Sequence, residues 1–156
     1  MPHESCCKDA VSAFASYAAQ YAKQLVRLIP MTPIRVNRIE NMRIHNLEAV
    51  HREFNDTFDI DILVGLSAAD TAFAKLMLHR RHVYEHNGGE SDGKYIADSG
   101  DTSVREKQML RETQETAHRI AGLVQRIETN LHRGFHEIFQ PVPEPIERHA
   151  RQTSQS

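Results

Sequence analysis

The sequence predicts an all-α protein, namely a bundle of four main helices with a glycine-rich loop after the third helix and a disordered C-terminal tail. Apolar residues recur every three to four positions in four segments, which is the spacing of one helix face. Glycine and proline, the weakest helix formers, number only 7 and 6 among the 156 residues and are clustered. A chain of this length suits one domain, which we expect at 8–139, followed by the tail at 140–156.

The first two helices are expected at 9–29 and about 34–55. Their apolar sides consist of Val11, Phe14, Ala18, Tyr21, Leu25 and Leu28 in the first, and of Val36, Ile39, Leu47, Val50 and Phe54 in the second. Pro30 ends the first helix, because proline lacks the backbone N–H that a helix needs. The stretch 55–66 breaks the helical period, so we expect a connecting loop with a short apolar insert.

A third helix is expected to begin after Ser67, because Ser67 and Asp70 resemble a capping arrangement. It should end near residue 86, where Asn87 and two glycines tolerate a left-handed backbone. The following segment, 87–101, is polar and has four glycines, and we therefore expect a loop.

The remainder of the chain predicts one long helix and a tail. The stretch 104–110 fits either a short strand or a lead-in to a helix. A fourth helix is expected at about 113–139, where apolar residues repeat every three to four positions. The segment 140–156 has three prolines and a polar end, which predicts disorder.

Composition excludes several classes of function. The net charge is −2, so any binding of nucleic acid must depend on a local patch. The only cysteines, Cys6 and Cys7, are adjacent and cannot connect distant parts of the chain, which favours a reducing compartment. The longest charge-free run, 10–22, is too short to span a bilayer and lacks the basic start of a signal peptide. We therefore expect a cytoplasmic protein without a membrane partner.

The segment "HRRHVYEHNGG" (79–89) has five basic or imidazole side chains within eight positions, and three interpretations are open. In the first, these residues only stabilise a helix end, since cations there interact favourably with the helix dipole, and Arg81 and Glu85 form an i,i+4 pair. In the second, His82 and His86, with the histidine one turn earlier, bind zinc or nickel. No cysteine lies nearby, however, and the adjacent arginines would repel a cation.

In the third interpretation, Arg81 and His86 cleave RNA without a metal. The forked guanidinium suits phosphate oxygens, and an imidazole can exchange a proton near neutral pH. A base would take the proton of the ribose 2′-hydroxyl while the cation stabilises the charge on the phosphate. Five residues apart on a continuous helix, the two side chains point about 140° apart. They converge only if the helix frays near Asn87 and Gly88, or if a partner chain completes the site.

The residues "RHVYEH" (81–86) resemble the motif of HEPN domains (higher eukaryotes and prokaryotes nucleotide-binding), which is Arg, a polar residue, three variable residues and His. The pattern "NGG…D…Y…GD" that follows is similar to the loop after this motif in many bacterial members. The resemblance covers roughly 67–101, and the other helices are compatible with the small helical bundle of the family. It implies an HEPN-like helical domain over 8–139.

Catalytic members of this family are metal-independent endoribonucleases that dimerise and bring both motifs into one cleft. The resemblance therefore implies Arg81 and His86 as the catalytic pair. It implies His82 as a supporting polar residue at the substrate and Asn87 as a neighbour of the phosphate. Arg80 would add electrostatic attraction for the substrate, or would be a solvated surface arginine.

The resemblance also implies the partners: single-stranded RNA as substrate, a homodimer with a composite active site, and an antitoxin or defence-system protein in bacteria. It implies no cofactor. One toxin subgroup has a tyrosine two residues after the motif histidine, which a partner nucleotidyltransferase modifies. Gly88 occupies that position here, which argues against this pairing.

A non-catalytic HEPN module is the rival interpretation. Such a module dimerises or binds a nucleotide and serves as a scaffold or sensor. The net charge of −2 and the lack of an extended basic face favour it.

Overall fold

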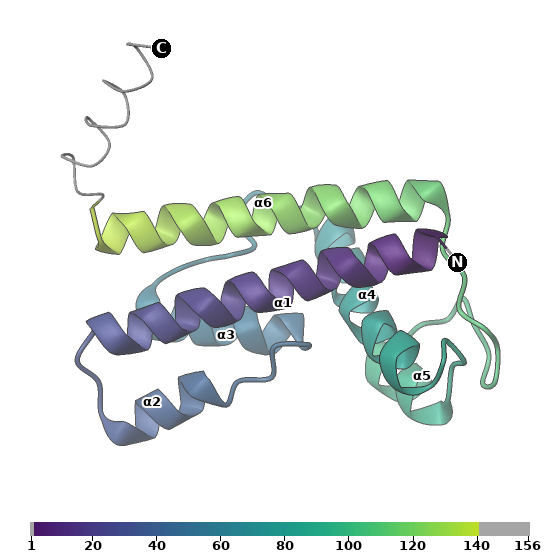
Figure 1. Ribbon diagram of the computed structural model, residues 1–156, viewed down its shortest axis with the longest axis horizontal. Coiled ribbons are helices and arrows are strands. Elements are labelled where there is room, and N and C mark those ends of the chain that lie inside the picture. Colours follow the sequence, from purple (N-terminus) through teal and green to yellow (C-terminus); the bar gives the residue numbers. More distant parts are fainter. Residues whose placement is uncertain (1, 141–156) are drawn as a thin grey trace, which may run out of the picture.

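A computed structural model describes residues 2–140, and all of its named secondary structure is helical (Figure 1). The helices are α1 (Pro2–Leu28), α2 (Pro33–Glu40), α3 (Leu47–Phe58), α4 (Ala68–His86), α5 (Gly93–Ser99) and α6 (Gln114–Ile138). The all-α prediction is confirmed for residues 2–140, which form six helices in place of the four expected. Apart from Gln140, the predicted tail lies outside the described residues. No helix in the described part of the chain is both long and apolar enough to cross a membrane.

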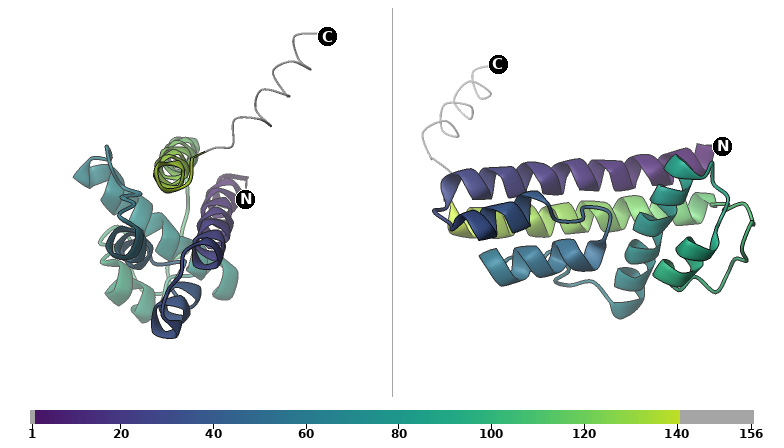
Figure 2. Two further views of the ribbon diagram at one scale, coloured as in Figure 1. Left: turned by 90° about the vertical axis from the view of Figure 1, so that its left-hand side faces the viewer. Right: turned by 90° about the horizontal axis from the view of Figure 1, so that it is seen from below.

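The two long helices, α1 and α6, lie side by side and run in the same direction (Figures 1 and 2). The shorter helices α2 and α3 lie near the end at which α1 and α6 finish, and α4 crosses α1 and α6 nearer their beginnings (Figure 1). One core joins these helices through fully buried side chains, among them Phe14, Leu25, Phe54, Met77, Ile127 and Leu131. A second, small cluster of Val83, Tyr95 and Leu110 attaches α5 to the far end of α4.

The predicted helix 34–55 is wrong, because the structure divides it into α2 and α3. Asn41 is the C-cap of α2, and its own N–H bonds back to Asn37 and Ile39. Asn46 is the N-cap of α3, where its side-chain oxygen accepts from Ala49 N at 3.1 Å. Asparagine is favoured at both ends of helices because its short amide can bond the backbone there. Residues 41–46 therefore form a loop between α2 and α3 where a continuous helix was expected.

The glycine-rich loop 87–101 is also only partly a loop, because it contains α5. Asp92 is the N-cap of this short helix and accepts from Tyr95 N at 2.8 Å. Gly88 and Gly89, with φ of 62° and 88°, end α4 in the left-handed region as expected. Gly100 ends α5 in the same way, with φ 66°. Two helix ends therefore account for three of the four glycines.

The predictions for α4 and α6 agree closely with the structure. Ser67 accepts from Asp70 N at 3.1 Å and caps α4, as its position suggested. Thr113 and Thr116 form a capping box at the start of α6. Gly134 permits a close crossing of α6 by the loop after α3, because a Cβ at this position would lie 2.6 Å from Ile60 Cγ2.

Candidate functional site

The motif residues occupy the last turns of α4, where Arg81 faces α1. Its Nε donates to Ser12 Oγ of α1 at 3.0 Å, and its Nη2 pairs with Glu85 Oε1 at 3.2 Å. The predicted i,i+4 pair between Arg81 and Glu85 is therefore confirmed. The Arg81 side chain is 23% exposed, so two partners hold it at a half-buried position.

Arg80, by contrast, is buried, so the expectation of a solvated surface arginine is wrong. The residue is only 9% exposed. Its guanidinium donates to Glu112 at 2.7 Å, Asp101 at 2.9 Å, Tyr95 at 3.1 Å and Ser103 at 3.2 Å. The Arg80 side chain is 11% exposed, and all three guanidinium nitrogens donate to partners within the protein. We call Arg80 and these four partners the Arg80 network.

The two carboxylates of the Arg80 network depend on the arginine. The Asp101 side chain is 3% exposed and that of Glu112 is fully buried. Burial raises the pKa of Asp101, but hydrogen bonds from Ser103, Tyr95 and Arg80 outweigh it and lower the pKa to about 2. Glu112 Oε1 also accepts from Tyr84 Oη at 2.7 Å, whereas its Oε2 has no hydrogen-bond partner among the described residues.

The Arg80 network explains the pattern "D…Y…GD" that follows the motif. Asp92 caps α5, Tyr95 bonds Arg80 and Asp101, and Gly100 turns the chain so that Asp101 meets Arg80. These residues fix α5 and the segment before α6 against α4. Their contribution is to hold the end of α4, and the histidines on it, in a defined position.

Three imidazoles form a row at the end of α4. The rings of His82 and His86 are 4.5 Å apart between centroids. His82 is stacked on His45 at 5.9 Å with an interplanar angle of 27°. His82 and His86 are exposed, and His45 comes from the loop 41–46. We call these three residues the histidine row.

Sequence reasoning placed His45 inside a continuous helix and missed its approach to α4. The signal that could have found it is the pair Asn41 and Asn46, two residue types suited to helix ends, with His45 between them. Its partner His82 lies on another element, so no local pattern indicates the contact.

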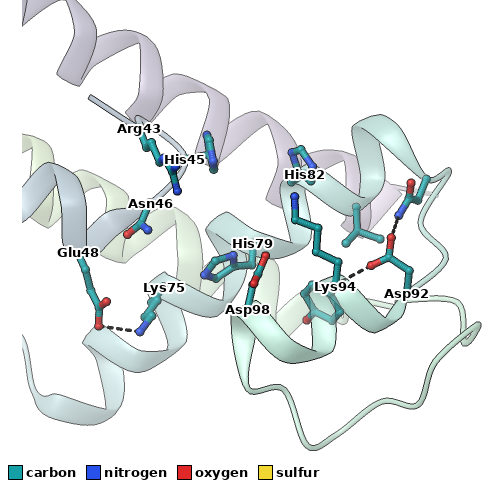
Figure 3. Close-up of a pocket in the computed structure, with 13 residues that line it drawn as sticks. Arg43, His45, Asn46, Glu48, Lys75, His79, His82, Asp92, Lys94 and Asp98 are labelled. Atoms are coloured by element: carbon teal, nitrogen blue, oxygen red, sulfur yellow. Dashed lines mark hydrogen bonds and ion pairs between the residues drawn. The ribbon is translucent and has the colours of Figure 1, made fainter. Parts of the chain in front are cut away.

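A cleft of about 490 Å³ opens beside the histidine row, between the loop 41–46, α4 and α5 (Figure 3). Its basic and imidazole side chains are Arg43, His45, Lys75, His79, His82 and Lys94. Three carboxylates also line it, namely Glu48, Asp92 and Asp98. Asn87 contributes to the wall and donates from Nδ2 to Asp92 Oδ2 at 2.7 Å. We call this feature the histidine cleft.

Two imidazoles of the histidine cleft are held in the neutral form near neutral pH. Partial burial lowers the pKa of His45, and the nearby charges of His82, Arg43 and Arg81 lower it further. Burial also lowers the pKa of His79, and Lys75 adds to this effect, while Asp98 opposes it. A neutral imidazole can accept a proton or a hydrogen bond, which a charged one cannot.

The structure brings only some of the predicted site residues together. His82 and Asn87 line the histidine cleft, and His86 contacts His82 at its edge. Arg81 bonds to α1 and does not line the cleft, although its charge reaches His45. Within one chain, Arg81 and His86 therefore do not face a common point.

The alternative of a metal site finds no support in the geometry. Across residues 2–140, no three His, Cys, Asp or Glu side chains are grouped so that they could hold a metal ion. His79 lies in the histidine cleft, whereas His86 lies outside the cleft lining, so the three histidines of the motif helix do not converge on one point.

The interpretation of Arg81 and His86 as a catalytic pair thus rests on their chemistry and on the motif "RHVYEH" itself. Comparison of the chain with protein-family models, with curated proteins and with solved structures found no match.

Proposed function

We propose that the protein is a metal-independent endoribonuclease of the HEPN type that cleaves single-stranded RNA. The observation that carries this proposal is the histidine row, which continues into a cleft with several cations. Cleavage of an RNA phosphodiester by the neighbouring 2′-hydroxyl needs proton transfer and positive charge at the phosphate. Imidazoles can transfer the protons, and cations supply the charge. They occur here on one surface, although the chain as a whole is slightly acidic.

The reaction is an internal transesterification. A base removes the proton of the ribose 2′-hydroxyl, and the 2′-oxygen attacks the phosphorus. The bond from phosphorus to the 5′-oxygen then breaks, and an acid donates a proton to that oxygen. The products carry a 2′,3′-cyclic phosphate and a 5′-hydroxyl. His86, which is exposed, is the proposed base, and Arg81 is the proposed cation at the phosphate.

A homodimer is part of the proposal because the two catalytic side chains diverge in one chain. Arg81 faces α1, whereas His86 lies against His82 toward the histidine cleft. Two copies that meet at the ends of their α4 helices would place His86 of one beside Arg81 of the other, as an isologous twofold contact allows. Each composite site would then receive its base and its cation from different chains.

The biological setting belongs to the same proposal. An RNA-cleaving domain of this kind would act in the cytoplasm of a bacterium, in defence against phage or in a toxin–antitoxin pair. A partner protein that covers the end of α4 would then serve as its antitoxin or regulator.

A non-catalytic scaffold or sensor is the second candidate, and one observation favours it. Arg81 already has a carboxylate partner, Glu85, at 3.2 Å, and this pairing reduces the positive charge that a phosphate would meet. In this alternative the helix end dimerises or binds a nucleotide without cleaving it.

Cleavage of RNA in the presence of EDTA distinguishes the two candidates. Untagged protein is incubated with a labelled pool of random-sequence single-stranded RNA, beside Arg81→Ala and His86→Ala. The ribonuclease predicts cleavage by wild type and at least about a hundredfold loss in both variants. His118→Ala and Arg133→Ala, exposed residues of α6 far from the motif in sequence, are the matched controls and should keep full activity. If clean wild-type protein leaves every RNA in the pool intact, the ribonuclease is wrong and the scaffold is favoured.

A further inference from the structure

The histidine cleft has two cations without a carboxylate partner. Lys75 is paired with Glu48 at 2.6 Å. Arg43 and Lys94, on opposite sides of the cleft, form no ion pair within residues 2–140 (Figure 3). Both residues are exposed.

One of the three carboxylates of the cleft is paired with a cation. Glu48 is bound by Lys75, and Asp92 accepts from Asn87 at 2.7 Å and from Tyr95 N at 2.8 Å. Neither Asp92 nor Asp98 forms an ion pair within residues 2–140, and the charge of Asp98 raises the pKa of His79. Two unpaired cations therefore face two carboxylates without an ion pair, so the lining is neutral as a whole, and an anion would be held locally by Arg43 and Lys94.

The remaining features of the cleft fit a nucleotide better than a simple ion. Its volume of about 490 Å³ lies within the usual range for pockets that bind small organic ligands. The stacked rings of His45 and His82 offer a flat surface, and nucleobases of single-stranded RNA commonly stack on such side chains. His82 also contacts His86, so the cleft lies next to the proposed catalytic base.

We propose that the histidine cleft binds one nucleotide of the RNA strand that flanks the cleaved bond, with Arg43 and Lys94 holding its phosphate and the His45–His82 pair beside its base. This inference rests on the proposed ribonuclease function and names the part of the protein that binds the substrate next to the catalytic pair. It assigns binding to three residues outside the motif: Arg43, His45 and Lys94.

Binding of an uncleavable RNA tests the inference separately from catalysis. A fluorescent single-stranded oligonucleotide with 2′-O-methyl riboses cannot undergo the reaction, so its affinity for wild-type protein can be measured by anisotropy. Arg43→Ala and Lys94→Ala should each weaken binding about tenfold, because each removes a charged contact to phosphate. Each should also lower the salt dependence of log Kd by about one charge. Arg133→Ala and Lys23→Ala, which remove exposed cations elsewhere, should have little effect.

A mononucleotide and inorganic phosphate serve as competitors that identify the source of the phosphate. Displacement of the RNA only at high concentration of either competitor supports a strand-binding site. If Arg43→Ala and Lys94→Ala bind the RNA as tightly as wild type does, the inference is wrong. It is also wrong if the wild-type protein binds the mononucleotide tightly but does not bind the RNA. In cleavage assays the two variants should raise KM and leave kcat nearly unchanged, whereas His86→Ala should lower kcat. If both variants are active and their KM is unaltered, the nucleotide-binding role of the cleft is wrong, whereas the proposed ribonuclease function is not affected.

Discussion

Replacement of Arg80 by methionine should strongly destabilise the protein, although the residue lies within the motif segment and next to Arg81. The substitution keeps the length and apolar stem of the side chain but removes its charge. It leaves Asp101 and Glu112, whose side chains are 3% and 0% exposed, without their cation. Removing one partner of a buried ion pair costs about 3–5 kcal/mol. That is a large part of the 5–15 kcal/mol that roughly stabilises a typical domain.

The matched control is Arg81→Met, one residue along the same helix. This side chain is 23% exposed and makes one hydrogen bond to Ser12 and one ion pair with Glu85. Losing these contacts should cost only about 1 kcal/mol, because exposed pairs and single hydrogen bonds contribute little. Urea denaturation followed by circular dichroism at neutral pH measures both differences.

A rescue experiment identifies the cause of the Arg80 effect. In the Arg80→Met background, Asp101→Asn together with Glu112→Gln should restore part of the lost stability, because neutral amides carry no uncompensated charge. An Arg80→Met variant within about 1 kcal/mol of wild type would refute the buried network. Equal losses in Arg80→Met and Arg81→Met would refute the distinction between the two arginines.

Three further predictions concern stability. The pKa of Asp101 is about 2 in the folded protein, against an ordinary value of 3.8, so the unfolded chain binds more protons between these two pH values. Acid should therefore remove about 2 kcal/mol of stability as the pH falls from about 5 to 2. Urea titrations at a series of pH values measure this loss, and Asp101→Asn should abolish it. Gly134→Ala should destabilise the protein by about 1–3 kcal/mol in thermal melts despite the better helix propensity of alanine, because the new Cβ would lie 2.6 Å from Ile60 Cγ2. Asn46→Ala should lower stability by about 1 kcal/mol through loss of the bond to Ala49 N, whereas Asn46→Asp should retain most of it.

The elements that sequence reasoning located correctly are those whose ends are marked locally. Ser67 and Asp70 mark the start of α4, and the two glycines after Asn87 mark its end. The periodic apolar residues of α6 fix its range to within one residue at each end. Both signals lie within a few positions of the helix that they define, so a local pattern is sufficient.

The residues that sequence reasoning misplaced are those with partners far along the chain. Arg80 is buried by Asp101 and Glu112, which lie 21 and 32 positions away. Arg80 follows Met77 by three residues and precedes Tyr84 by four, which places it on the buried side of α4, but nothing local indicates the distant carboxylates that bury it. The position of His45 is hidden for a related reason, because the apolar period of 34–55 continues across the two asparagines that end α2 and begin α3.

The candidate site is accordingly only partly visible in the sequence. The motif identifies Arg81, His82 and His86, which follow one another on a single helix. The histidine cleft joins that helix to α5 and to the loop 41–46, and depends on how these elements pack. Its cations Arg43 and Lys94 follow from tertiary structure alone.

Complementation between two inactive variants tests the composite site most directly. Arg81→Ala and His86→Ala chains, carrying different tags, are produced together and assayed for cleavage of single-stranded RNA in EDTA. If each site takes Arg81 from one chain and His86 from the other, a mixed dimer has one intact site. About half of the dimers are mixed, so the mixture should recover roughly one quarter of wild-type activity. A mixture that forms mixed dimers and remains as inactive as either variant alone would contradict the account.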